Sequence, residues 1–390
     1  MKVNYMSKIK FSQTGWISLI SDDFTFNNLR IIAQAVCNYF RRTQNYIDNF
    51  PPRLAIGFDS RFMGTKYADI ISEVVTKNGF DAHVSDRPST TAAIFWSVKT
   101  LTLTGGIMIT AGDSPYEFNG IKICNNQGAL LRDKTTAEIE EDIENIKQEG
   151  IPELPITSGE IIEFNPKHYY FHQLSNIVSL SKIGKAGIDI TVDTFNASPS
   201  NYLRDILINY DCMVREVNNK LSYDFGGLTP DLHKKNLFNL QQTVIAPRNN
   251  LQVGFAIDGD GSKIKAIDIS GSILSDEAVF CIILKHLFEN KGIKKGVVKP
   301  LSEGKLIDKL AARYSLPVID SKTKDGRSIS EALRVNDCVL GSTLDGDYHI
   351  NLHHILEKDG VLAILLILEA MSYYKQNLNS IYNQICQEVE

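Results

Sequence analysis

Short apolar segments alternate with amphipathic ones along the first third of the chain, and this alternation constrains the fold most strongly. Leu54–Phe58 and Gly106–Thr110 are compact apolar runs that predict strands. Between them, Tyr67, Ile71 and Val75 recur at helical spacing, which predicts an amphipathic helix. Strand–helix alternation of this kind predicts an α/β fold in which mixed or parallel sheets are sandwiched by helices.

Two polar, helix-breaking segments divide the chain. Gly150–Pro155 interrupts a helical pattern with a glycine and two prolines, and Ala246–Asn250 is a second loop-forming segment. We therefore expect three consecutive units at residues 1–160, 161–249 and 250–390. Each unit has the same order of strand, polar loop and helix, which indicates a threefold internal repeat.

The composition of the 390 residues narrows the classes of function. A net charge of −5 and a pI of about 6.0 argue against a nucleic-acid partner. The longest apolar run, Gly360–Leu368, is too short to span a bilayer and predicts a buried helix. The six cysteines are scattered without a C-x-x-C pair, and residues 1–10 lack the apolar stretch of a signal peptide. We expect reduced thiols and a cytoplasmic protein.

The first polar loop follows the strand that ends at Thr110. It reads T-A-G-D-S-P from Thr110 and continues to N-G-I-K, which ends at Lys122. This stretch resembles the active-site loop of the phosphoglucomutase/phosphomannomutase family, T-A-S-H-N-P-x-x-N-G-x-K. In that family the serine carries the phosphoryl group, and the resemblance places Gly112 at its position. Glycine has no side-chain oxygen, and the nearest oxygen-bearing side chains in the loop are Asp113 and Ser114.

A second loop, D-G-D-G-S-K, also follows an apolar strand. Closely spaced carboxylates on a glycine-rich turn, here Asp258 and Asp260, suit a hard cation such as Mg²⁺, although an acidic surface turn has the same composition. The family pattern is D-G-D-x-D-R, so the resemblance puts Ser262 at the third metal ligand and Lys263 at the arginine. We expect no cofactor, or at most weak Mg²⁺ binding.

A third loop and an early turn complete the resemblance. The loop L-G-S-T-L-D-G matches the family's sugar-binding G-E-x-S-G, with Ser342 at the glutamate position, followed by Thr343. These two residues and Lys263 are the candidate substrate contacts, with an ordinary polar loop as the preferred alternative for the first two. The turn D-S-R ending at Arg61 resembles the family's D-T-R. Arg61 and Lys122 are either anion contacts, or a turn-stabilising arginine and a solvated lysine.

The resemblance extends from Phe11 to about Met371 and implies three α/β domains. The family has a fourth, C-terminal domain with a phosphate clamp, which we do not find in the sequence up to Glu390. Loss of the carrier serine, a metal ligand, the sugar-loop glutamate and the clamp predicts a catalytically inactive protein with a binding, regulatory or structural role. The alternatives are residual activity through Asp113 or Ser114, or completion by a partner chain. Expected partners are a sugar phosphate and a second copy or another protein, but no nucleic acid and no membrane.

Overall fold

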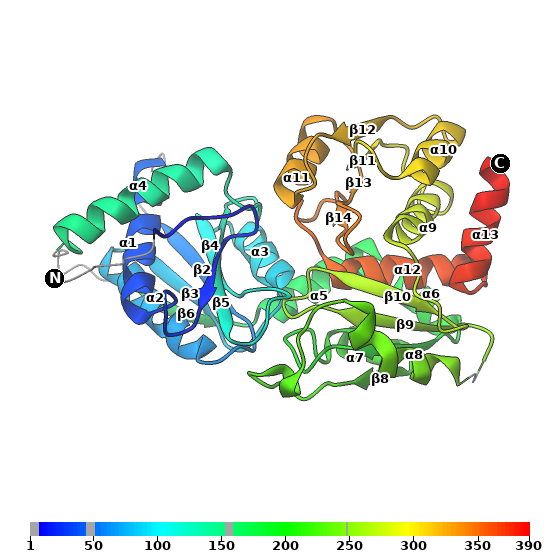
Figure 1. Ribbon diagram of the computed structural model, residues 1–390, viewed down its shortest axis with the longest axis horizontal. Coiled ribbons are helices and arrows are strands. Elements are labelled where there is room, and N and C mark those ends of the chain that lie inside the picture. The colour runs from blue at the N-terminus through cyan, green and yellow to red at the C-terminus, as the bar shows by residue number, and fades with distance from the viewer. Residues whose placement is uncertain (1–7, 44–50, 153–158, 247–248) are drawn as a thin grey trace.

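The computed structural model describes residues 8–43, 51–152, 159–246 and 249–390, which form three α/β units (Figure 1). Each unit is built around one sheet that contains both parallel and antiparallel strand pairs. The predicted fold class, consecutive α/β units with mixed sheets and covering helices, is confirmed.

The first sheet has six strands in the order β1-β5-β4-β2-β3-β6. The strands are β1 (Trp16–Leu19), β2 (Arg53–Phe58), β3 (Asp81–Ser85), β4 (Gly105–Ile109), β5 (Phe118–Asn125) and β6 (Ile161–Phe164). β4, β2, β3 and β6 run parallel, and β5 is antiparallel to both β4 and β1. β2 and β4 are covered on both faces, which explains why their sequences are continuous apolar runs.

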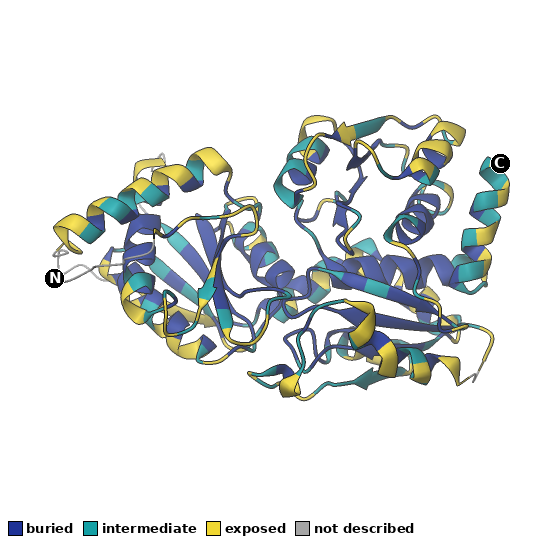
Figure 2. Cartoon of the chain, viewed as in Figure 1, coloured by how far each residue is buried: buried dark blue, intermediate teal, exposed yellow. Residues whose placement is uncertain are grey.

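Helices cover both faces of this sheet (Figure 1). On one face lie α1 (Phe26–Thr43), α2 (Gly64–Lys77) and α4 (Asp133–Glu149); on the other lie α3 (Thr91–Thr100) and α5 (Pro166–Ile177). Each helix buries one stripe. In α4, Ile139, Ile143 and Ile146 are buried, while the opposite side of the helix is exposed (Figure 2).

The second sheet has the order β10-β9-β7-β8. Its strands are β7 (Asp189–Asp193), β8 (Val214–Val217), β9 (Gln252–Ile257) and β10 (Ile264–Asp268), and its helices are α6 (Leu180–Lys185), α7 (Tyr202–Leu207) and α8 (Phe238–Ile245), with short 3₁₀ turns at Ile208–Tyr210, Phe225–Gly227 and Lys234–Leu237. β7 is parallel to β8 and β9, whereas β9 and β10 form an antiparallel hairpin.

The third sheet has the order β12-β11-β13-β14. Its strands are β11 (Val297–Pro300), β12 (Val318–Ser321), β13 (Leu340–Gly341) and β14 (His349–Ile350), and its helices are α9 (Asp276–Glu289), α10 (Lys305–Arg313), α11 (Gly326–Val335), α12 (Gly360–Tyr374) and α13 (Leu378–Val389). β11 is parallel to both β12 and β13, whereas β13 and β14 form an antiparallel pair.

The three sheets therefore share one kind of strand pair. In each, a parallel strand turns back into an antiparallel partner, giving the pairs β4–β5, β9–β10 and β13–β14. The connections within these pairs, residues 110–117, 258–263 and 342–348, are the three polar loops singled out in the sequence. The fold thus places equivalent loops at equivalent ends of three sheets.

Two expected unit boundaries cut through sheets. β6 pairs with β3 in the first sheet, although residue 161 was expected to begin the second unit. β9 and β10 pair within the second sheet, although residue 250 was expected to begin the third. The first strand after each expected boundary returns to the sheet of the preceding unit, because a strand that follows a loop can pair within the same sheet.

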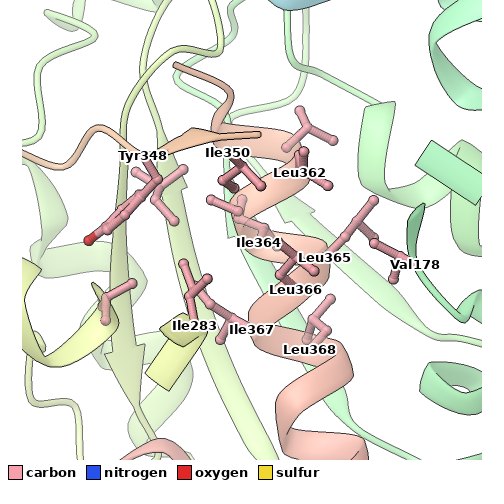
Figure 3. Close-up of a cluster of buried hydrophobic side chains, with 14 of the residues drawn as sticks. Val178, Ile283, Tyr348, Ile350, Leu362, Ile364, Leu365, Leu366, Ile367 and Leu368 are labelled. Atoms are coloured by element: carbon pink, nitrogen blue, oxygen red, sulfur yellow. The ribbon is translucent and has the colours of Figure 1, made fainter. Parts of the chain in front are cut away.

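α12 joins the second and third units. All its residues from Gly360 to Ser372 are buried, and it packs against α9, α6, β9 and β10. Figure 3 shows its leucine and isoleucine side chains projecting in several directions into one apolar cluster, with Val178 and Ile283 among their neighbours. A helix that is apolar on all sides must be covered on all sides, which explains its central position.

Two further findings concern single residues and helices. Within the described ranges, no helix is long and apolar enough to cross a membrane. All six cysteines are free thiols, and four of them are buried.

Candidate active site

The three polar loops meet around the side chain of Lys263. Its ammonium nitrogen lies 3.0 Å from Asp113 Oδ2 in the first loop and 2.8 Å from Asp345 Oδ2 in the third. Lys263 itself belongs to the second loop. One lysine therefore ties together loops from all three units, and the sequence-predicted residues Asp113 and Lys263 are in direct contact.

Gly112 lies at the centre of the first loop with a left-handed backbone, φ 59°. Its N–H donates to Thr110 Oγ1 at 3.0 Å. A side chain at this position would face the second loop, because the nearest atoms to an ideal Cβ are Lys122 Nζ at 3.9 Å and Asp260 Oδ1 at 4.0 Å. The position is open, and it is aimed at the Lys122–Asp260 pair.

Arg61 holds the first loop in shape. Its side chain is fully buried, and its Nε donates to Asp59 Oδ2 at 3.1 Å. The two terminal nitrogens donate to main-chain carbonyl oxygens of Gly112, Ser114, Pro115 and Phe118 at 2.7–3.0 Å. A guanidinium has five N–H donors, and these contacts use all of them. Of the two sequence interpretations, the geometry favours the turn-stabilising one.

The second loop is organised by Asp258. Its Oδ1 accepts from the N–H groups of Ser262 and Lys263 at 2.6 and 2.9 Å, and its Oδ2 accepts from the Ser262 hydroxyl at 3.0 Å. Burial, together with the nearby carboxylates of Asp260 and Asp113, raises the pKa of Asp258 to about 7. Asp258 therefore serves mainly to close its own turn.

Asp260 projects from the same loop toward the first unit. Its Oδ2 accepts from the ammonium of Lys122 on β5 and from the hydroxyl of Thr91 at the start of α3. Its Oδ1 is buried and has no partner among the described residues. Burial opposes ionisation, but Lys122 outweighs it and lowers the pKa of Asp260. In turn, burial opposes the charge on Lys122, yet Asp260 raises the pKa of that ammonium.

These residues do not fit a magnesium site. Mg²⁺ takes about six oxygens in a tight octahedron. Both carboxylate oxygens of Asp258 and the Ser262 hydroxyl are used within the turn, and Lys122 occupies Asp260. No group of three or more histidine, cysteine or acidic residues in the described ranges is arranged to hold a metal ion. The expected metal ligands are brought together, but only one of their oxygens, Asp260 Oδ1, is left without a donor.

Asp113 and Ser114 differ in how well their side chains can act as nucleophiles. The Asp113 side chain is 42% exposed, and although its partial burial opposes ionisation, Lys263 and Lys358 lower its pKa, so it is a carboxylate. The Ser114 N–H donates to the Ala111 carbonyl oxygen at 3.1 Å. No described contact joins the Ser114 hydroxyl to a base. Asp113 is therefore the better nucleophile of the two.

The third loop turns its polar side chains inward. Asp347 Oδ1 accepts from the hydroxyls of Ser342 and Thr343 at 3.2 and 2.8 Å and from the Thr343 N–H at 2.8 Å. Burial opposes the charge of Asp347, but His349 and Lys358 hold its pKa well below the usual range. Ser342 and Thr343, the candidate sugar contacts, thus donate their hydroxyl hydrogen bonds to Asp347 within the same loop.

The sequence did not reveal three residues of this site. Thr91 belongs to none of the motifs described above, yet its hydroxyl donates to Asp260. Asp347 looks like an ordinary loop carboxylate. Lys358 lies outside every motif, but its charge acts on both Asp113 and Asp347. Only the Ser-Thr-Thr helix start, a recognisable capping pattern, offered a signal in advance.

Comparison with known families gives matches along nearly the whole chain. Descriptions of the phosphoglucomutase/phosphomannomutase α/β/α domains I, II and III match residues 8–150, 168–271 and 275–389, respectively. The order of the three matches is the order of the three sheets.

Two curated relatives are named phosphoglucosamine mutase. The protein from Methanocaldococcus jannaschii is 29% identical over 285 residues, which is 72% of this chain and 61% of that protein. The one from Methanococcus maripaludis is 27% identical over 339 residues, 85% of this chain and 72% of that protein. The chain thus spans about three fifths to three quarters of the length of these relatives.

A solved structure agrees in fold. The open form of pp63/parafusin, a phosphoglucomutase from Paramecium, superposes with a TM-score of 0.83 at 18% identity, covering 99% of this chain and 75% of that one. The expectation of a catalytically inactive protein is contradicted by these comparisons, because the curated relatives are named as mutases. That expectation gave the missing serine at position 112 too much weight, since the carboxylate of Asp113 and the hydroxyl of Ser114 lie in the same loop.

Proposed function

The chain belongs to the phosphoglucomutase/phosphomannomutase family, and from this premise we propose that it is a mutase that moves a phosphoryl group between positions of a hexose or hexosamine phosphate. The hexosamine part of the proposal rests on the relatives named phosphoglucosamine mutase. The observation that carries the proposal is the ionised Asp113 carboxylate, which lies next to Gly112 and is paired with Lys263.

Asp113 is the proposed phosphoryl carrier. Aspartate carboxylates form covalent phosphoryl intermediates in other phosphotransfer enzymes. Asp113 is ionised and part-exposed, and the left-handed backbone of Gly112 directly before it sets the turn that presents it. Ser114, the other predicted acceptor, would need a base to take its proton.

The transfer is balanced as two half-reactions. A carboxylate oxygen of Asp113 attacks phosphorus, a new oxygen–phosphorus bond forms, and the ester bond to the sugar oxygen breaks. That sugar oxygen leaves as a hydroxyl with a proton from water. In the return step the other sugar hydroxyl attacks the aspartyl phosphate, loses its proton to water and regenerates the carboxylate. No oxidant or further co-reactant is consumed.

The lysines around Asp113 supply the charge that this transfer requires. Phosphoryl transfer is accelerated mainly by positioning and by electrostatic stabilisation of the phosphoryl oxygens. Lys263 contacts Asp113, and Lys358 acts on it electrostatically, so both would face a phosphoryl group held there. Arg61 positions the loop through its carbonyl oxygens, and its donors are used by these oxygens and Asp59.

Intact-mass analysis tests this proposal. We expect the chain to gain one phosphoryl group on incubation with glucose 1,6-bisphosphate, and the adduct to be released by hydroxylamine, which cleaves acyl phosphates and leaves serine phosphates intact. Asp113→Asn should abolish the adduct and the turnover of glucose 1-phosphate and glucosamine 6-phosphate. A surface control, Asp337→Asn, removes a carboxylate that is 74% exposed and should change neither.

Two outcomes would change the assignment. An adduct that survives hydroxylamine and disappears in Ser114→Ala would move the carrier to Ser114. No adduct, together with no turnover of either monophosphate at high enzyme concentration, would overturn the proposed activity.

Completion of the site by a partner chain or a second copy stays a prediction. Light scattering during turnover tests this prediction, because it distinguishes a single chain of 43.6 kDa from a larger assembly. Full activity at that mass would contradict it.

A further inference from the structure

The ammonium of Lys122, a cation that is part of the chain, lies against Asp260 in the second loop. We propose that the ammonium of Lys122 takes the place of a divalent metal ion at the Asp258–Asp260 turn, so that the turn excludes Mg²⁺ for as long as this lysine is present. The inference does not rest on the proposed mutase activity, since metal binding is measured without turnover.

The ammonium of Lys122 already forms an ion pair with Asp260 of the turn. Its side chain is 7% exposed, its partner Asp260 is fully buried, and Asp260 Oδ2 accepts from Lys122 and Thr91 together. A divalent ion at Asp260 would have to displace the ammonium from a buried carboxylate. Two cations cannot share the site without strong repulsion at short range.

Lys122 cannot easily move aside. It is on β5, where it pairs with Met108 of β4, so its backbone is fixed within the first sheet. Its methylene stem runs beneath Gly15, where an added Cβ would lie 3.1 Å from Lys122 Cγ. A flexible surface lysine could swing into solvent to admit a metal ion, whereas this stem is enclosed.

The remaining oxygens of the turn are also committed. Asp258 accepts three hydrogen bonds from its own turn, and the Ser262 hydroxyl donates one of them. Position 112 supplies no oxygen, because Gly112 has no side chain and the space beside it ends 3.9 Å away at Lys122 Nζ. With Lys122 in place, Asp260 Oδ1 is the one carboxylate oxygen of the turn that has no hydrogen-bond donor among the described residues.

Removal of the ammonium alone should therefore create a metal site. In Lys122→Met the stem keeps its length and the charge is lost, so both oxygens of the Asp260 carboxylate are left without a cation beside them. We measure Mn²⁺ binding to the full chain by electron paramagnetic resonance and calorimetry. We expect no binding by the wild type up to millimolar Mn²⁺. Lys122→Met should bind Mn²⁺ with a dissociation constant at least tenfold below that concentration.

Two controls locate the effect. The double variant Lys122→Met/Asp260→Asn should lose the gained binding. Lys99→Met removes another half-buried lysine of the first unit, whose ammonium donates to the His354 carbonyl oxygen rather than to a carboxylate, and it should bind no Mn²⁺. Wild-type Mn²⁺ binding that Asp260→Asn abolishes would overturn the proposal, as would a folded Lys122→Met that gains none.

Because a buried carboxylate without a cation destabilises the fold, the wild type provides a second test that does not depend on the folding of Lys122→Met. Its melting temperature should be the same in MgCl₂ and in EDTA at equal ionic strength. A rise in MgCl₂ that is absent in Asp258→Asn would overturn the proposal without reference to the lysine variant.

Discussion

Lys263 and Asp113, which are 150 positions apart in the sequence, form an ion pair of 3.0 Å that joins the second unit to the first. The same ammonium reaches Asp345 in the third unit at 2.8 Å. All three residues sit in loops that the sequence analysis singled out separately, and these contacts bring the three loops together.

Replacement of Lys263 by methionine should raise the pKa of Asp113. Lys263 is the main group that holds this pKa below its usual value, so the native carboxylate stabilises the fold above pH 4 and loses this contribution as the pH falls. Carbon-13 NMR titration of Asp113 measures the change. Because the Asp113 side chain is 42% exposed, the cost in stability should stay below about 1 kcal/mol. Lys295→Met, which breaks a surface pair with Asp337, is the control and should leave Asp113 unchanged.

Gly112→Ser should give the loop a second phosphoryl acceptor. No atom lies closer than 3.9 Å to the added Cβ, so the side chain fits, but a φ of 59° makes a non-glycine residue cost about 1 kcal/mol. Intact-mass analysis should then show an adduct that resists hydroxylamine. Gly292→Ser, at an open position with a φ of 68°, should show the same loss of stability and no adduct. An unchanged adduct in Gly112→Ser would contradict the orientation of this position.

Arg61→Met should destabilise the whole first unit. It removes five hydrogen bonds and leaves Asp59 buried with no cation beside it, for which a loss of about 3–5 kcal/mol is expected. Urea denaturation measures it. Arg87→Met, whose guanidinium is 51% exposed beside Asp86, should change stability by less than about 0.5 kcal/mol. Equal effects of the two substitutions would show that the carbonyl contacts of Arg61 contribute little.

Asp193 should produce a pH dependence of stability near pH 5. Burial at the end of β7 raises its pKa to about 6, from an ordinary 3.8. The folded state then holds a proton that the unfolded state has lost, so this group makes stability fall as the pH rises from about 4 to 6. Asp193→Asn mimics the protonated form, and its stability relative to the wild type should rise by about 3 kcal/mol across that interval. Denaturation curves at pH 4 and 7 test it; a constant difference would contradict the burial argument.

The strands, helices and loops of this protein could be read from the sequence because they follow from local patterns. Apolar runs such as Leu54–Phe58 became buried strands, and the polar loops after them became the hairpin connections of three sheets. The position of Gly112 opposite a D-G-D turn likewise followed from motif order. The unit boundaries did not, because the pairing of β9 with β7 is a long-range contact that no local pattern encodes.

The roles of individual charges needed the tertiary structure. In the sequence, Arg61 and Lys122 were equally good as anion contacts, or as a turn-stabilising arginine and a solvated lysine, since both interpretations require the same side chains. Lys122 is not solvated, because its side chain is 7% exposed. Folding places the carbonyl oxygens of four loop residues around Arg61 and a buried aspartate beside Lys122, and these partners come from distant segments. For Ser342, an ordinary polar loop was the preferred interpretation, and the fold places Asp347 where it accepts from the Ser342 hydroxyl.

The sequence by itself therefore determined the three α/β units, the places of their polar loops and the absence of a side-chain oxygen at position 112. Only the tertiary structure decided which charges neutralise one another: Lys263 with Asp113, and Lys122 with Asp260. The physical reason is that strand and helix patterns depend on neighbours in the chain, whereas the energy of an ion pair depends on distance and burial, which exist only once the loops have been brought together.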